Sequence, residues 1–232
     1  MLSEEFLCII PAKGTSNRLK RKNIAMLNGK PLIEYAIDAA KKADIFKEIF
    51  VSTEDDAIKR MAENYGAIVP YMRPEELSKD PAGVVDVCLH MINYLEGIGK
   101  FYKTLFILLP TSPLRTDVDI ISALNNFARS DAKVLMSISE YMHTPFAALK
   151  VDGKGYLSPY FPKLINLKSQ KMPKAYICNG AVTILDITEF KMQKNYHFYP
   201  MASYTMPWER SIDIDNEIDL KFAEFIMKVG TK

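Results

Sequence analysis

A basic loop near the N-terminus is the first segment whose residue types could do chemistry. Between Lys13 and Lys30 the chain has six basic residues and no acidic one: Lys13, Arg18, Lys20, Arg21, Lys22 and Lys30. Gly14 and Ser16 lie in the same loop, directly after an apolar run, and such loops bind phosphate groups. The segment is not a Walker A loop, because Pro31 follows the Gly-Lys pair where Ser or Thr would bind magnesium. A solvated basic loop is the alternative interpretation.

Acidic residues gather at the opposite end of the chain. Between residues 211 and 220 there are four acids and no base: Asp213, Asp215, Glu217 and Asp219. The first two alternate with isoleucines, and this period of two predicts a strand with Asp213 and Asp215 on one face. Two carboxylates about 7 Å apart on a strand suit a magnesium ion that also binds a phosphate. Acids that cap the last helix are one alternative; an EF-hand is another, but Ile218 occupies its obligatory glycine position.

A proline-bounded turn, Leu109 to Arg115, offers a third set of polar groups. It follows a strongly apolar run, and its two prolines restrict the backbone. Thr111, Ser112 and Arg115 are donors for an anionic or hydroxyl-rich ligand. A purely structural turn between a strand and a helix is the alternative. Two further loop ends carry similar donors, Arg73 and Asn179.

The elements that must position these residues alternate between apolar, β-rich runs and amphipathic helical stretches. This pattern predicts an α/β fold with a mostly parallel, buried sheet. We expect strands at 6–12, 47–53, 67–71, 105–109, 133–139, 181–185 and 196–204, and helices from 31, at 55–65, 84–95, 117–128 and 217–228. Ligands bind beyond the carboxyl ends of parallel strands, so the basic loop and the acidic segment are expected at one edge of the sheet.

Residues 141–174 interrupt the pattern with prolines, scattered aromatic residues and an Asp-Gly-Lys-Gly turn. These features predict a hairpin that protrudes from the domain as a lid or a dimerisation arm. The chain contains no long linker and no repeat, so residues 1–232 are expected to form one domain with this protrusion.

Composition excludes several classes of protein. The 232 residues have 30 basic and 28 acidic side chains and are 48% hydrophobic, which is typical of a globular domain and not of a disordered chain or a membrane protein. A net charge of +2 argues against a protein that coats nucleic acid. Cys8, Cys88 and Cys178 are far apart in apolar sequence, so we expect buried free thiols. The acidic start of the chain is unlike a signal peptide, so a cytoplasmic protein is expected.

The motifs, taken in order, resemble the CMP-sialic acid synthetase family of cytidylyltransferases. The resemblance runs from about Ile9 to Ala223 and rests on Lys13-x-x-Ser16 with Lys22-Asn23, Pro31-Leu32-Ile33, Val51-Ser52-Thr53-Glu54-Asp55, Arg73-Pro74-x-Glu76-Leu77-x-x-Asp80, Pro110 to Arg115, Asn179-Gly180-Ala181 and Asp213-Ile214-Asp215. It implies a Rossmann-like nucleotidyltransferase fold and transfer of CMP from CTP to a nine-carbon 2-keto-3-deoxy sugar acid, with release of pyrophosphate. It also implies Mg²⁺ as cofactor and a homodimer formed through the 141–174 arm.

The resemblance assigns roles to individual residues. It implies catalytic roles for Lys22, Asp213 and Asp215, and it implies that Asp213 and Asp215 bind the magnesium ion. Residues expected at CTP are Lys13, Gly14, Ser16, Arg18, Lys22, Asn23 and Arg73, with the last two near the cytidine. Residues expected at the sugar are Leu109, Thr111, Ser112, Arg115 and Asn179.

Several positions depart from the family pattern, mostly on the sugar side. Lys13 replaces the usual arginine and loses its bidentate fork. Leu109 replaces a glutamine that touches the sugar, and the basic sugar-binding positions of the arm align with Ala147 and with Ser169 or Ile177. Lysines that could substitute are Lys168, Lys171 and Lys174. We therefore expect a nonulosonic acid other than N-acetylneuraminate, such as a legionaminic or pseudaminic type. The alternatives are a nucleotidyltransferase for an octulosonate or another sugar, and a nucleotide-binding protein without catalysis.

Overall fold

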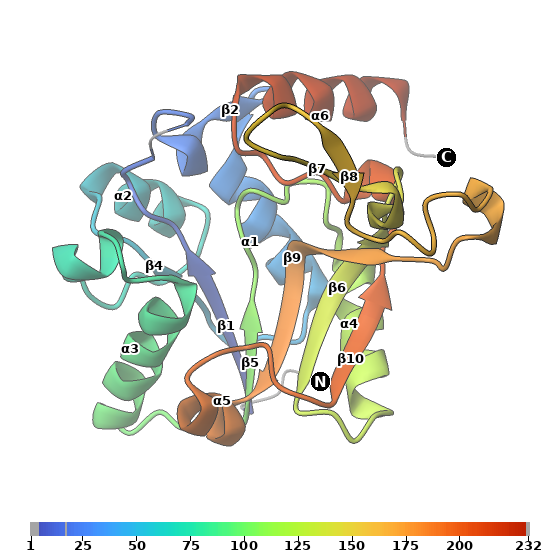
Figure 1. Ribbon diagram of the computed structural model, residues 1–232. Coiled ribbons are helices and arrows are strands. Elements are labelled where there is room, and N and C mark those ends of the chain that lie inside the picture. The colour runs from blue at the N-terminus through green and yellow to red at the C-terminus, as the bar shows by residue number, and fades with distance from the viewer. Residues whose placement is uncertain (1–4, 17, 231–232) are drawn as a thin grey trace.

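A six-stranded sheet forms the centre of the protein in the computed structural model, which describes residues 5–16 and 18–230 (Figure 1). The strand order is β10-β6-β9-β5-β1-β4. The strands are β1 (Phe6–Pro11), β4 (Ile49–Ser52), β5 (Thr104–Ile107), β6 (Val134–Glu140), β9 (Tyr176–Asp186) and β10 (Met201–Thr205). β1 is parallel to β4 and β5, and β10 is parallel to β6, whereas β9 runs antiparallel to both its neighbours. The predicted α/β fold with a mostly parallel sheet is confirmed.

Helices cover both faces of this sheet, which explains why its strands read as continuous apolar runs. In β1, Cys8 and Ile10 pack into the cluster that contains α1, α2 and α4, whereas Leu7 and Ile9 pack into the cluster that contains α3 and α5. The helices are α1 (Leu32–Ala43), α2 (Asp56–Asn64), α3 (Val84–Gly97), α4 (Asp117–Ala128) and α5 (Ile187–Gln193). Among the described residues, no helix is both long and apolar enough to cross a membrane.

The last helix, α6 (Glu217–Val229), lies across the upper end of the sheet in Figure 1. Asn216 caps it by accepting hydrogen bonds from the N–H groups of Ile218 and Asp219. The Asp219 carboxylate accepts from the N–H groups of Asp215 and Asn216. Asn216 and Asp219 thus cap the helix, and not Asp215 with Glu217 as the capping alternative supposes, which leaves the Asp215 side chain available for other contacts. Near the start of α6, a small hydrophobic cluster includes Leu27 of the β2–β3 hairpin (Met26–Leu27 and Lys30–Pro31).

Two predicted strands are absent from the described chain. Residues 67–71 form only one bridge, between Ile68 and Phe50, and Pro70 cannot donate the hydrogen bond that would extend it. Residues 213–215 are extended but belong to no sheet, because the N–H of Ile214 donates to the carbonyl of Thr111 and not to a strand. Ile214 is nevertheless fully buried, so the alternation that suggested a strand does separate a core residue from the acids.

The three cysteines are free, but only two of them have the predicted burial. Cys8 and Cys88 are buried, whereas Cys178 is exposed. The prediction for Cys178 is wrong, because this residue lies in the part of β9 (Tyr176–Asp186) next to the arm, where the side chains of Tyr176 and Ile177 are exposed as well.

Residues 141–174 form a protruding arm, as the break in pattern predicted. It contains a short hairpin of β7 (Leu149–Val151) and β8 (Leu157–Pro159), and Phe146 packs edge-on against Phe161. The N–H of Tyr141 donates to the carbonyl of Ala175 at 3.0 Å, so the arm leaves and rejoins the sheet at one point. The hairpin lies below α6 in Figure 1, outside the layers that enclose the sheet.

Candidate functional site

The basic loop is anchored by two consecutive acids that follow β4. The N–H of Gly14 donates to Glu54 Oε1 at 2.7 Å, and the Arg21 guanidinium lies 3.1 Å from the Asp55 carboxylate. A Cβ atom on Gly14 would lie 2.7 Å from the Asp55 side chain, so only glycine permits this close approach. Arg21 has a positive φ of 53°, which turns the loop toward the buried Asn23. Asn17, in the middle of the loop, lies outside the described residues.

Asn23 stabilises the start of the loop from within. Its side-chain N–H donates to the carbonyl of Lys13 at 2.8 Å, and its own side chain is buried. Lys13 is exposed and Ser16 is half-buried. The loop therefore has an anchored backbone at Lys13 and polar side chains with access to solvent, an arrangement that suits phosphate binding.

The loop and the acidic segment meet, although they are 193 positions apart in sequence. Lys22 Nζ lies 2.8 Å from Asp215 Oδ1, and Arg18 Nη1 lies 2.7 Å from Asp215 Oδ2. Partial burial raises the pKa of Asp215, but these two cations outweigh it and hold the pKa below its ordinary value. The predicted meeting of the two charged segments at one edge of the sheet is confirmed.

Asp213 differs from its neighbour in having no ion pair among the described residues. Loss of hydration raises its pKa above the ordinary value, a hydrogen bond with Thr111 opposes the shift, and the charge of Asp215 adds to it. Two acids of one chain segment therefore have different environments: Asp215 is paired with two cations, whereas Asp213 has no ion pair among the described residues and the charge of Lys22 only partly offsets its loss of hydration.

Both charged segments border a cavity of about 270 Å³ beyond the carboxyl ends of β1, β4 and β5. It is lined by Lys13, Lys22, Asn23, Arg73, Ser78, Gly83, Leu109, Pro110, Thr111 and Asp213, among others. Five predicted residues of the nucleotide and metal sites thus share one cavity with two predicted for the sugar, Leu109 and Thr111. Gly14, Ser16, Arg18 and Asp215 lie outside its lining but in the segments that form its rim.

Three residues predicted to bind the sugar have buried positions with internal hydrogen bonds. Ser112 donates to the backbone carbonyl of Asn179 at 3.3 Å. The Asn179 side chain accepts from Ser137 at 2.6 Å and donates to Ser211 at 2.9 Å. Arg115 is 3% exposed, and its Nη1 donates to the carbonyls of Leu109 and Ala181. In the described structure these side chains brace the turn that presents Leu109 and Thr111, and they do not line the cavity beside those residues.

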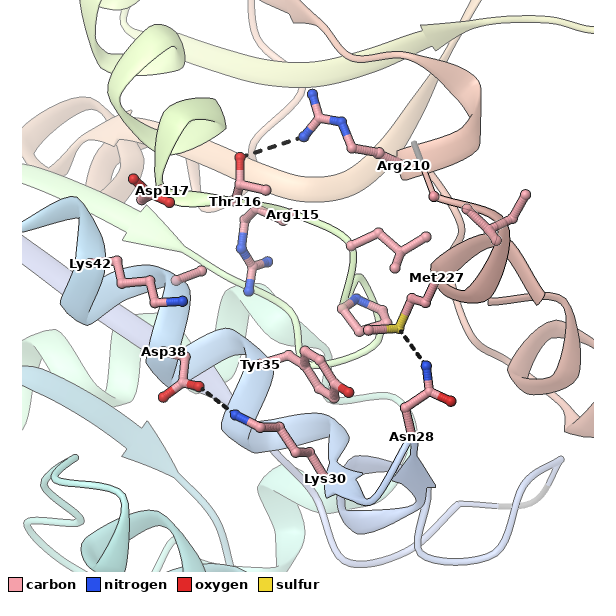
Figure 2. Close-up of a pocket in the computed structure, with 15 residues that line it drawn as sticks. Asn28, Lys30, Tyr35, Asp38, Lys42, Arg115, Thr116, Asp117, Arg210 and Met227 are labelled. Atoms are coloured by element: carbon pink, nitrogen blue, oxygen red, sulfur yellow. Dashed lines mark hydrogen bonds and ion pairs between the residues drawn. The ribbon is translucent and has the colours of Figure 1, made fainter. Parts of the chain in front are cut away.

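Arg115 instead borders a second, larger hollow of about 680 Å³ between α1, α4 and α6 (Figure 2). Burial lowers the pKa of Arg115 to about 10, so its guanidinium still carries a charge at neutral pH. Two other cations there have acidic partners: Lys30 contacts Asp38 at 3.1 Å (Figure 2), and Arg210 contacts Asp119. Of the predicted site residues, only Arg115 lines this hollow, so the candidate site is the smaller cavity.

Sequence reasoning missed Glu54 and Ser78 as members of the site. Glu54 Oε2 lies 2.5 Å from Arg73 Nη2, and Arg73 Nε donates to Ser78 Oγ at 3.1 Å. Burial raises the pKa of Glu54, but hydrogen bonds from Ser78 and Gly14 and the charge of Arg73 bring it below its ordinary value. The position of Glu54 after a predicted buried strand was the available signal, because that is where parallel sheets place ligand-binding groups.

Comparison with solved structures defines the class of fold. The structure matches a CMP:2-keto-3-deoxy-manno-octonic acid synthetase complexed with CTP, with a TM-score of 0.70 and 14% identity over 97% of this chain and 99% of that one. It also matches 4-diphosphocytidyl-2C-methyl-D-erythritol synthase from Anaerococcus prevotii, with a TM-score of 0.66 and 12% identity over 96% and 98% of the two chains. The fold is that of the Rossmann-like nucleotidyltransferases.

Sequence comparison places the chain more narrowly. A family model described as cytidylyltransferase matches residues 7–102. Pseudaminic acid cytidylyltransferase of Campylobacter jejuni is 32% identical over 97% of both chains, and CMP-N,N'-diacetyllegionaminic acid synthase of Legionella pneumophila is 30% identical over 97% of both. An N-acylneuraminate cytidylyltransferase of Escherichia coli is 29% identical over 94% of this chain and 51% of that protein. The chain belongs to this family of nonulosonic acid cytidylyltransferases, which confirms the resemblance seen in its motifs.

Proposed function

We propose that the protein transfers CMP from CTP to the anomeric hydroxyl of a nonulosonic acid and releases pyrophosphate. The observation that carries this proposal is the contact of the cationic loop with Asp215, beside a cavity that also contains Asp213 and Arg73. Cationic side chains bind the phosphate oxygens of a triphosphate, and carboxylates bind the magnesium ion that accompanies it. Both kinds of side chain lie at one edge of this cavity.

The chemistry is an in-line displacement at the α-phosphorus of CTP. The anomeric oxygen forms a bond to phosphorus and loses its proton, and the bond from phosphorus to the bridging oxygen of pyrophosphate breaks. Such a reaction depends on positioning and charge neutralisation, without a covalent nucleophile in the protein. Lys13, Arg18 and Lys22 neutralise and orient the phosphates, and Ser16 donates a hydrogen bond to them. Gly14, whose N–H is bonded to Glu54, lets the loop pack closely against Asp55 beside them. Asn23 and Arg73 lie at the cytidine end of the cavity.

Asp213 and Asp215 would hold the Mg²⁺ cofactor. The fit is chemical: both are hard oxygen donors, and Asp213 has a raised pKa that a nearby divalent cation would lower. No group of three or more His, Cys, Asp or Glu side chains able to hold a metal occurs in the described part of the chain, so phosphate oxygens and waters would complete the shell. When bound, the ion supplies charge stabilisation to the transferring phosphoryl group and its leaving group.

The substrate we propose is a pseudaminic or legionaminic type of acid, with an apolar substituent near Leu109. Leu109 borders the cavity and cannot form a hydrogen bond through its side chain. Two relatives that the chain covers over 97% of their length are named for pseudaminic and diacetyllegionaminic acid. An octulosonate substrate is the second candidate, because one similar structure is an octonic acid synthetase. We also propose a homodimer formed through the arm, and a cytoplasmic location.

Pyrophosphate release tests the reaction. The purified protein is incubated with MgCl₂ and each of the four nucleoside triphosphates, together with a panel of sialic, legionaminic, pseudaminic and octulosonic acids. We expect release with CTP and with a legionaminic or pseudaminic acid. Release with an octulosonic acid alone would favour the second candidate. CTP binding without product from any acid would favour a non-catalytic nucleotide-binding protein.

A further inference from the structure

Glu54 occupies a position behind the nucleotide cavity that joins two of its walls. Its carboxylate does not line the cavity, yet Oε1 accepts from the N–H of Gly14 and Oε2 accepts from Arg73 Nη2, at 2.7 and 2.5 Å. Gly14 belongs to the phosphate loop, and Arg73 belongs to the segment on the cytidine side. One carboxylate therefore connects the part of the site that holds phosphates to the part that holds the base.

The Arg73 guanidinium depends on Glu54 for its only anionic partner among the described residues. The Arg73 guanidinium is 3% exposed, and besides Glu54 it donates from Nε to Ser78 Oγ. Its Nη1 has no protein acceptor among the described residues and is the nitrogen left for a ligand. Without an anionic partner, nothing would offset the cost of burying the charge of this guanidinium, and its orientation would no longer be fixed. The Glu54 side chain is 13% exposed, so water cannot readily take its place.

We infer that Glu54 is a positioning residue that sets the affinity for the nucleotide by fixing Arg73 and the phosphate loop relative to each other. It acts through Gly14 and Arg73 and does not touch the reacting atoms. The inference rests on the proposed function, because it takes the cavity as the CTP site. Its consequence is a separation of kinetic effects: loss of Glu54 weakens CTP binding and leaves the chemical step and the sugar site nearly intact.

Three variants separate this role from a general effect on folding. In Glu54→Gln the amide has one oxygen, so it satisfies Gly14 or Arg73 but turns its NH₂ toward the other donor. Glu54→Asp keeps two accepting oxygens and the charge but shortens the reach. Asp56→Asn is the matched control, because Asp56 is an exposed acid two residues away in the first turn of α2. Thermal unfolding is measured for each variant alongside the kinetics.

We expect Glu54→Gln to raise KM for CTP about tenfold, the effect of losing one charge-assisted hydrogen bond, while kcat changes less than about threefold. KM for the sugar acid stays unchanged, and Glu54→Asp gives an intermediate KM for CTP. In an Arg73→Ala background, adding Glu54→Gln raises KM for CTP by much less than tenfold. A KM for CTP equal to that of Asp56→Asn, or a loss confined to kcat, would overturn the inference.

The assay also distinguishes this inference from the proposed function. A wild-type protein that releases no pyrophosphate from CTP with any acid contradicts the proposed function. An active wild type with an unaffected Glu54→Gln contradicts only the role of Glu54. If Glu54→Gln does not fold, titration of Glu54→Asp with CTP gives the answer: unchanged affinity overturns the inference, and affinity reduced several-fold supports it.

Discussion

The cavity that we assign to the nucleotide and the arm differ in how they bury charged and apolar side chains. Around the cavity, ionic side chains are drawn inward: Arg73 is 3% exposed against Glu54, and Lys22 is 18% exposed against Asp215. At the base of the arm, the Lys174–Glu140 pair is 69% and 49% exposed, and the arm presents large apolar side chains such as Tyr156 to solvent. Exposed ion pairs contribute little to the stability of the fold, and a large exposed apolar surface often marks a site of interaction with another molecule. The nucleotide side is thus braced within one chain, whereas the arm is not.

The largest effect we expect is the loss of turnover when either acid of the cavity edge is neutralised. Asp213→Asn or Asp215→Asn should lower kcat by at least about 100-fold, because charge at the transferring phosphoryl group loses its stabilisation. Pyrophosphate release with CTP and MgCl₂ measures the effect, and circular dichroism checks that the fold is retained. Near wild-type release by both variants would remove the metal assignment.

Negative charge placed on the arm should disrupt the homodimer that we propose. The double variant Tyr156→Asp with Tyr160→Asp places two carboxylates on the exposed hairpin region, where burial against a second copy would become unfavourable. If the protein is the homodimer that we propose, we expect the wild type to sediment as a dimer and the double variant as a monomer in sedimentation velocity, with a CTP affinity of the variant within about twofold of the wild type. Lys163→Ala in the same arm serves as control. Dimers that persist in the double variant would show that the arm is not the interface.

Truncation of a side chain near the cavity should lower the free energy of unfolding more than a truncation in the arm. Leu108→Ala, at the residue before the turn, truncates a fully buried apolar side chain and leaves a void, which we expect to cost about 3 kcal/mol of unfolding free energy. Leu157→Ala in the arm should cost less than about 0.5 kcal/mol, because its side chain is exposed. Urea unfolding measures both. Equal costs would mean that the arm is packed as firmly as the core at Leu108.

A smaller change is expected from the specificity position. Leu109→Gln introduces an amide at the cavity wall beside Gly180, where there is little spare space. We expect kcat/KM for the preferred acid to fall about tenfold relative to N-acetylneuraminate, the usual effect of a mismatched polar group in an apolar pocket. Kinetics with both acids measure the ratio. An unchanged ratio would place the sugar away from Leu109.

The smallest expected effect concerns pH. Because the folded-state pKa of Asp213 is raised, the native protein binds this proton more tightly than the unfolded chain, so the group lowers stability as pH rises through the raised value. Asp213→Asn should therefore have a higher Tm than the wild type at pH 7 in EDTA, and the difference should vanish toward pH 3. A lower Tm at pH 7 would contradict the raised pKa.

Sequence patterns predicted the layers of the fold better than the roles of single polar residues. Apolar runs such as that of β1 locate buried strands, because nearly every residue in them faces a helix layer. The same patterns cannot say which polar residue is buried: Ser112 and Asn179 looked like ligand groups, yet each meets a partner from a distant strand or loop. Only the fold brings Ser137 to Asn179 or Glu54 to Arg73. The extended segment 213–215 was mistaken for a strand because alternating burial does not require a sheet partner.

The arm begins and ends at two residues that are hydrogen-bonded to each other, Tyr141 and Ala175. Since Tyr141 and Ala175 are direct neighbours, everything between them is an insertion whose length does not affect the pairing of β6 with β9. We therefore expect that an arm of another length or chemistry can be grafted between these two residues without a change in the pairing of β6 with β9. The cavity that we assign to the nucleotide would be kept while the arm is replaced.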